Sequence, residues 1–132
     1  MAAHIIRLGS PRSVGEGLRL GTVRRPPRGV PKSAFASRDY YDVWLPTLAP
    51  SQDLLREHAR GGDASADWAH FARRYRQEMK APAAAQLLDL LAALSQDTPF
   101  ALGCYCELET HCHRSILREL LAARGAVIDT LP

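Results

Sequence analysis

The last third of the chain carries a strand, a helix and a second strand in close succession, and this order constrains the fold most. Residues 100–104 (Phe-Ala-Leu-Gly-Cys) are typical of a buried strand, residues 112–124 have helical spacing and stop before Gly125, and a closing strand follows at 126–129. Such a unit predicts a parallel crossover. We therefore expect a three-layer, Rossmann-like α/β fold with a mostly parallel sheet.

Further strands and helices are expected before this unit. Strands are predicted at residues 4–8, as an edge strand, at 18–24 and at 40–45, where aromatic and branched residues favour extended structure. Three helices are predicted in the middle of the chain. The first begins at residues 50–53 and ends at Gly61-Gly62, and the second begins at Ser65 or Asp67 and runs past Tyr75. The third runs from Pro82 to about Leu94. The 132 residues show no repeat or domain boundary, so residues 1–132 are expected to form one domain.

Charge is distributed unevenly along the chain. Residues 1–38 hold eight basic residues and one acidic residue, whereas residues 39–132 hold nine basic and thirteen acidic residues. Seven of the first eight are arginines, whose guanidinium groups bind carboxylates and phosphates at two points. We therefore expect a basic N-terminal arm beside a strand–helix core, with an anionic partner, although solvated surface charge is the alternative. The residues expected to bind the anion are Arg12, Arg24, Arg25 and Arg28.

All three cysteines lie within nine positions of the sequence, and two histidines flank the last of them. Cys104 and Cys106 end the predicted strand, and their two-residue spacing places them on one face. Cys112 begins the next helix, flanked by His111 and His113. Ligands of open α/β sheets collect beyond the carboxyl ends of the strands. The strand-to-helix crevice of residues 104–114 is therefore the candidate site.

Two chemistries at this crevice need no metal. A cysteine at a helix N-terminus beside histidine and arginine is favoured as a thiolate, so Cys112 or Cys106 is a candidate nucleophile. His113 is the candidate proton carrier, since histidine ordinarily titrates near neutrality. Without covalent chemistry, Arg114, Ser115 and the free amides at the helix start would bind an anion.

The same segment could instead hold zinc or another soft metal. The candidate ligands are Cys104, Cys106, Cys112 and either His111 or His113. Their C-x-C-x5-C-H spacing differs from the paired CxxC forms of common zinc sites. The alternative is that Cys104 and Cys106 are small buried hydrophobic residues. No disulfide framework is expected, because three cysteines leave one unpaired.

Acidic residues offer further candidates for proton transfer. Glu107 and Glu109 are alternative general bases, although acidic residues in such a loop are usually solvated. Asp42, inside an aromatic segment, is the acid of first interest. The C-x5-R spacing of Cys112 and Arg118 matches cysteine phosphatases, but the intervening residues lack glycine and favour a helix, so this interpretation is rejected.

Several stretches together resemble a known family. They are residues 7–12 (Arg-Leu-Gly-Ser-Pro-Arg), 15–17 (Gly-Glu-Gly), 21–32, 40–46 and the Cys-Tyr-Cys to Cys-His-Arg segment of residues 104–114. With these stretches the chain resembles the domain of unknown function 488 family, the YeaO-like group, from about Ile6 to Ala126. The resemblance implies a compact Rossmann-like α/β domain, and it implies no particular activity.

These features favour a small enzyme, or an enzyme-derived binding domain, for an anionic, phosphate- or nucleotide-like ligand. One alternative is a non-enzymatic nucleic-acid-binding protein with a structural metal site, and another is a thiol redox sensor. No apolar stretch approaches the roughly 20 residues of a membrane helix, and the N-terminus does not resemble a signal peptide. We therefore predict a cytoplasmic protein without a membrane partner.

Overall fold

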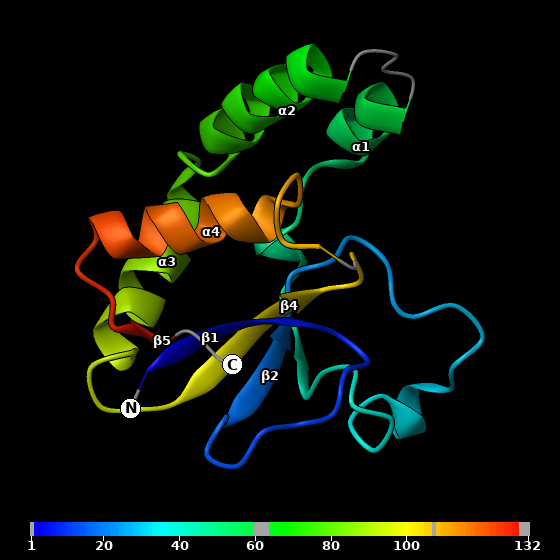
Figure 1. The fold of residues 1–132 in the computed structure, drawn as a ribbon, viewed down its shortest axis with the longest axis vertical. Coiled ribbons are helices and arrows are strands. Elements are labelled where there is room, and N and C mark those ends of the chain that lie inside the picture. The colour runs from blue at the N-terminus through cyan, green and yellow to red at the C-terminus, as the bar shows by residue number, and fades with distance from the viewer. Residues whose placement is uncertain (1, 60–63, 107, 130–132) are drawn as a thin grey trace.

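Five strands form one parallel sheet at the centre of the molecule (Figure 1). The computed structural model describes residues 2–59, 64–106 and 108–129. The strands are β1 (Ala3–Arg7), β2 (Leu18–Gly21), β3 (Val43–Trp44), β4 (Phe100–Cys104) and β5 (Ile128–Asp129), in the spatial order β3-β2-β4-β1-β5. Every neighbouring pair is parallel, so the predicted α/β fold with a mostly parallel sheet is confirmed.

Helices and a long connection cover the two faces of this sheet. The α-helices are α1 (Gln52–Ala59), α2 (Ala64–Glu78), α3 (Pro82–Leu94) and α4 (His113–Ala123), and short 3-10 helices lie at η1 (Lys32–Ala34) and η2 (Pro46–Leu48). Phe100 and Leu102 of β4 pack in one large core with residues from all four α-helices. Ala101, which points to the opposite face, packs in a smaller cluster with Ile6 and Tyr41. In Figure 1 the helices lie above and to the left of the sheet, and the β2–β3 connection, residues 22–42, lies to the right.

Some predicted strands differ from the structure in position or length. The strand predicted at the edge is β1, which lies inside the sheet because β5 pairs with it through Ala3 and Ile128. The strand predicted at 40–45 contains only Val43–Trp44, because the preceding Tyr41 is buried in the smaller cluster rather than in the ladder. The strands predicted at 18–24 and 126–129 are also shorter, and only β4 has the bounds predicted for it.

The helices follow the prediction closely. Helix α3 has the predicted bounds, and Ser51 accepts a hydrogen bond from the Leu54 amide at 3.1 Å at the start of α1. Helix α2 begins at Ala64, so the start predicted at Ser65 or Asp67 is one to three residues too late. The predicted helix end at Gly61-Gly62 lies outside the described residues. None of the described helices has the length and apolar character needed to cross a membrane.

The sheet topology creates a crevice at the carboxyl ends of β2 and β4. The chain leaves β2 toward β3 at one edge of the sheet, whereas it leaves β4 through α4 toward β5 at the other edge. Neighbouring strands whose connections diverge leave room for a ligand beyond their ends. Gly21 pairs with Gly103, and the following Thr22 amide donates to the Gly103 carbonyl at 3.0 Å. Thr22 and Cys104 therefore reach the crevice at the same level.

A buried ion pair fixes the loop before β2. Arg19 is 0% exposed, and its Nε atom lies 2.6 Å from Glu16 Oε2. The same guanidinium donates to the carbonyls of Asp39 at 2.5 Å and Pro11 at 3.1 Å. Burial, the largest single effect, raises the pKa of Glu16, but the hydrogen bonds from Arg19 and the Ser13 amide and the charges of Arg19 and Arg12 together outweigh it, so the net shift of this pKa is downward. Arg19 thus ties two loops to the sheet.

Asp42 anchors the end of the β2–β3 connection. Its carboxylate accepts hydrogen bonds from Arg12 at 2.9 and 3.1 Å and from the Arg19 amide at 2.8 Å. Burial, the largest single effect, raises the pKa of Asp42. The hydrogen bonds from Arg12 and the Arg19 amide, together with the charges of these two arginines, lower it by more, so the net shift is downward. Asp42 therefore serves as a structural anion.

Replacing Arg19 should destabilise the fold strongly. Arg19→Met leaves the carboxylate of Glu16 buried without a counter-charge, and we expect a loss of about 3–5 kcal/mol in the free energy of unfolding. Arg56→Met removes an exposed arginine that lies 3.4 Å from Asp53, and it should change stability by less than about 1 kcal/mol. Urea unfolding measures both variants. Equal losses in the two variants would contradict the role assigned to Arg19.

The contribution of Asp42 should depend on pH. Because its pKa in the folded protein lies below the ordinary value of 3.8, its contribution is complete above that value and is lost as the pH falls through the folded pKa. Asp42→Asn should be less stable than the parent at pH 7, and the difference should shrink in acid. Urea unfolding across a pH series measures this, with Asp53→Asn as the exposed control. A difference that stays constant down to the lowest pH would refute the assignment.

Candidate functional site

Three thiols converge at the crevice between β2 and β4. Cys104 ends β4, Cys112 is the N-cap residue of α4, and Cys106 lies in the loop between them. The Sγ atom of Cys104 lies 3.5 Å from that of Cys106 and 3.4 Å from that of Cys112, and all three Sγ atoms are within 4.8 Å of one another. Cys104 and Cys112 are buried and Cys106 is exposed; none is in a disulfide. These three residues are called the thiol cluster below.

Thr22 fixes the orientation of the buried His113 ring. The His113 Nε2 atom lies 2.7 Å from the Thr22 carbonyl oxygen and 3.1 Å from Thr22 Oγ1, which itself donates to the Gly103 carbonyl. A carbonyl oxygen only accepts hydrogen bonds, so Nε2 carries the proton. In the neutral ring, Nδ1 therefore has a free lone pair, and it lies 3.9 Å from Cys112 Sγ. Tyr75 packs edge-on against the ring, with 5.5 Å between ring centroids.

Arg114 supplies a positive charge directly beside the thiol cluster. The residue is only 3% exposed; its Nε atom donates to Cys112 Sγ at 3.4 Å and its Nη2 atom to the Cys106 carbonyl at 2.8 Å. No carboxylate among the described residues pairs with it. A buried guanidinium stays charged and requires a counter-charge, which a Cys112 thiolate provides.

The electrostatics of the cluster agree with this assignment. Hydrogen bonds with Cys104 and Cys106 lower the pKa of Cys112 despite its burial. The hydrogen bonds that Cys104 shares with Cys106 and Cys112 raise the pKa of Cys104. The negative charge of the cluster is therefore concentrated on Cys112, beside Arg114.

A cavity of about 290 Å³ opens beside the thiol cluster. Its lining is Val23, Arg24, Arg25, Pro50, Leu55, Cys104, Tyr105, Cys106 and His113. Cys104, Cys106 and His113 thus face the cavity, whereas Cys112 lies behind them. A ligand in this cavity would meet two sulfur atoms and an imidazole ring against an otherwise mostly apolar wall.

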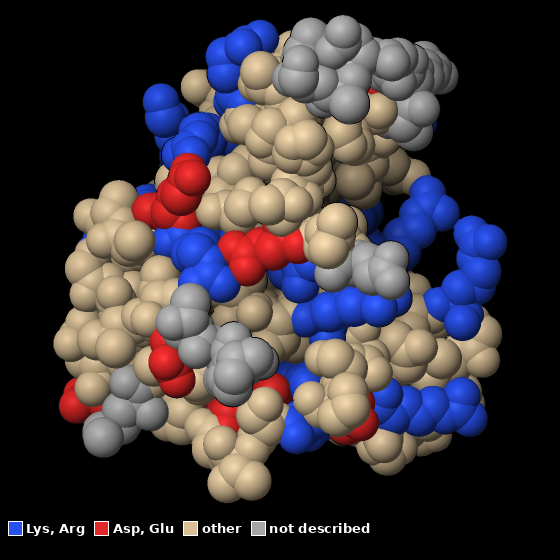
Figure 2. Space-filling model, viewed as in Figure 1, with Lys and Arg blue, Asp and Glu red and all other residues tan. Residues whose placement is uncertain are grey.

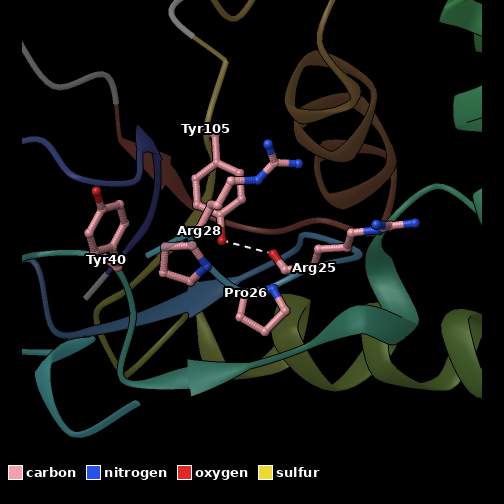
Figure 3. A pocket seen from close by; sticks show the side chains of 6 residues that line it. Arg25, Pro26, Arg28, Tyr40 and Tyr105 are labelled. Atoms are coloured by element: carbon pink, nitrogen blue, oxygen red, sulfur yellow. Dashed lines mark hydrogen bonds between the residues drawn. The ribbon is translucent and has the colours of Figure 1, made fainter. Parts of the chain in front are cut away.

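A second cavity, of about 520 Å³, also has Tyr105 in its lining and is called the arginine pocket below. It is lined by Arg25, Pro26, Pro27, Arg28, Tyr40 and Tyr105. In Figure 3, Tyr40 lies to the left of Tyr105, Pro26 lies below Tyr105, and the Arg28 side chain extends past the Tyr105 ring. The Tyr105 hydroxyl donates to the Arg25 carbonyl at 2.9 Å. Arg25 and Tyr105 line both cavities, so the two spaces adjoin.

The four arginines expected to bind an anion divide into two pairs. Arg25 and Arg28 line the arginine pocket. Arg12 lines neither cavity, because it pairs with Asp42 and lies 3.3 Å from Asp39. Arg24 lines the thiol-lined cavity, but its guanidinium donates to the carbonyls of residues 46, 49 and 50 at 3.0 to 3.2 Å. Of the four arginines, only Arg25 and Arg28 are therefore offered to a ligand at these cavities.

The remaining candidates lie around the cluster. His111 stacks on Trp68, with 5.2 Å between ring centroids, and is not part of the group of three thiols. The Ser115 hydroxyl donates to the Cys112 carbonyl at 2.8 Å and lines neither cavity. Glu109 binds Arg118 through two hydrogen bonds of 2.7 and 2.8 Å, which agrees with the rejection of a phosphatase loop. Glu107 lies outside the described residues.

Two residues of the site were missed by sequence reasoning. Thr22 orients His113, and Tyr105 lines both cavities. The only signal for Thr22 was its place in the second half of the strand predicted at 18–24. Using that signal requires knowing that β2 lies next to β4. Tyr105 stands between two of the cysteines, but its sequence position does not show the contact with Arg25.

Comparison with known proteins identifies the family. The family model described as the active DUF488-N3 subclade matches residues 3–125, a range that includes both cavities and the thiol cluster. No curated protein and no solved structure matches the chain. The chain therefore belongs to the domain of unknown function 488 family, as its sequence motifs indicated, within the DUF488-N3a subclade.

Proposed function

We propose that this protein binds an anionic, phosphate- or nucleotide-like ligand in the arginine pocket and acts on it at the adjoining thiol-lined cavity. The observation that carries this proposal is the pair of exposed arginines, Arg25 and Arg28, beside two tyrosines at the carboxyl ends of β2 and β4. The two cavities adjoin through Arg25 and Tyr105, so one ligand can reach both.

The charge of Arg25 and Arg28 is available to a ligand. Neither side chain forms an ion pair with any described residue, whereas Arg12, Arg19 and Arg118 are each bound to a carboxylate. Figure 2 shows basic side chains gathered on the right of the molecule, the side on which the β2–β3 connection lies in Figure 1. Two unpaired guanidinium groups at one pocket favour a phosphate, which they can contact at two points each.

The rest of the arginine pocket suits a planar group attached to that phosphate. The rings of Tyr40 and Tyr105 have centroids 6.2 Å apart and an interplanar angle of 74°. Aromatic faces stack on nucleobases, and arginine adds a cation–π contact. The volume of about 520 Å³ lies within the range of roughly 300–1,000 Å³ for small-molecule sites. These features support a nucleotide-like ligand over a bare inorganic ion.

The reacting end of the ligand would face His113 and Cys106. His113 Nδ1 has a lone pair that can accept a proton, because Thr22 binds the opposite nitrogen. Cys106 is the exposed thiol of the cluster. Behind it lies the Cys112 thiolate, whose negative charge is stabilised by the hydrogen bond from Arg114. His113 is therefore assigned the role of general base, and Cys106 that of the thiol nearest to the ligand.

Removing either exposed arginine should weaken binding of a nucleoside monophosphate. We expect adenosine 5′-monophosphate to bind more tightly than adenosine, and Arg25→Gln or Arg28→Gln to weaken it by about 10-fold or more. Hydrogen bonds to charged groups contribute about 1.5–3 kcal/mol each, which is consistent with such a loss. Isothermal titration calorimetry measures the dissociation constants, which should also rise with salt concentration.

Arg38→Gln is the matched control for this experiment. It removes the same charge from an exposed position in the β2–β3 connection that lines neither cavity. It should retain the parent affinity. Parent-like affinity in both pocket variants would refute the proposed pocket, and an equal loss in all three would indicate general charge attraction instead.

A further inference from the structure

We propose that Cys104, Cys106 and Cys112 together bind one soft divalent metal ion, zinc in the first instance, with a coordination position open toward the thiol-lined cavity. The inference goes beyond ligand binding in the arginine pocket. It depends on the thiol cluster and its neighbours, and not on the charges of Arg25 and Arg28.

The spacing of the three sulfur atoms is close to that of a tetrahedral thiolate site. Zinc–sulfur bonds of about 2.3 Å at tetrahedral angles place two sulfur ligands roughly 3.8 Å apart. The Sγ atom of Cys104 lies 3.5 and 3.4 Å from those of Cys106 and Cys112, and all three lie within 4.8 Å of one another. Shifts of a few tenths of an ångström would open these separations around an ion. Soft thiolate ligands select soft ions such as zinc.

Hydrogen bonds already surround the sulfur atoms as an outer shell does in metal–thiolate sites. The Cys106 amide donates to Cys104 Sγ at 3.4 Å, and Arg114 Nε donates to Cys112 Sγ at 3.4 Å. Arg114 also holds the loop through the Cys106 carbonyl at 2.8 Å. Such outer-shell bonds orient ligands and stabilise charge on them.

The net charge of the occupied site would also be balanced. Three thiolates and one divalent ion carry a single negative charge, and Arg114 carries a single positive charge beside them. Arg114 is buried and has no carboxylate partner among the described residues, so this neutralisation accounts for its position. A buried site with no net charge avoids the large desolvation cost of an isolated ion.

The described part of the chain supplies three ligands to this ion, which leaves a fourth position for water or a ligand. His111 is stacked on Trp68, and among the described residues the group of ligand atoms within 4.8 Å consists of the three sulfur atoms. Cys104 and Cys106 face the cavity of about 290 Å³, which is large enough for water or for part of a ligand. Zinc with three protein ligands and one open position is typical of catalytic rather than structural sites. We therefore assign the ion to the reacting end of the crevice.

The test is metal binding by the full chain, reduced and purified without a chelator or a histidine tag. Elemental analysis with native mass spectrometry should give one zinc ion per chain. Cobalt(II) titration should give a sulfur-to-cobalt charge-transfer absorption band. Cys104→Ser and Cys112→Ser should lose stoichiometric binding. Cys106→Ser alters an exposed side chain, should keep the circular dichroism spectrum of the parent, and should weaken binding by at least about 10-fold.

His111→Ala is the matched control, because it removes a neighbouring imidazole that lies outside the ligand group. It should bind cobalt as the parent does. A reduced, folded protein that binds no stoichiometric ion after equilibration with zinc would overturn the inference, as would parent-like cobalt binding by Cys106→Ser. Binding of adenosine 5′-monophosphate without metal binding would overturn this inference alone, and metal binding without nucleotide binding would overturn only the proposed arginine pocket.

Discussion

The hydrogen bond from His113 Nε2 to the Thr22 carbonyl, 2.7 Å long, is the contact on which the site depends. It joins the end of β2 to the start of α4, two segments that are 91 positions apart in the sequence. Without it, the imidazole ring could turn either nitrogen toward Cys112. With it, Nδ1 faces the thiol cluster, and the crevice between β2 and β4 gains a proton acceptor of defined orientation.

Arginine has two distinct roles in this protein, and burial separates them. Arg19 and Arg114 are buried and organise their surroundings: the first binds Glu16 and loop carbonyls, and the second binds the thiol cluster. Arg25 and Arg28 are exposed beside a pocket. The excess of arginine in the first part of the sequence is therefore not a single binding surface. Part of it holds the fold together, and a smaller part is available to a ligand.

Local sequence patterns predicted the bounds of some helices and strands better than they predicted which strands lie side by side in the sheet. The bounds of β4 and α3 follow from a continuous apolar run and from helical spacing after Pro82, which are properties of the segments themselves. The interior position of β1, by contrast, depends on pairing with β4 and β5, which periodicity does not report. The convergence of the cysteines was predictable because strand end, loop and helix start are contiguous. The pairing of Arg12 with Asp42 and the contact of Thr22 with His113 were not, because they join distant segments.

The most direct measurement is nitrogen-15 NMR of the imidazole of His113, in labelled protein at a pH where the ring is neutral. We expect the proton to reside on Nε2 and Nδ1 to be unprotonated, because a carbonyl oxygen can only accept the bond. Thr22→Val keeps the backbone carbonyl and should preserve this tautomer. A proton on Nδ1 would contradict the account, since His113 would then donate toward Cys112 and could not serve as the base of the crevice.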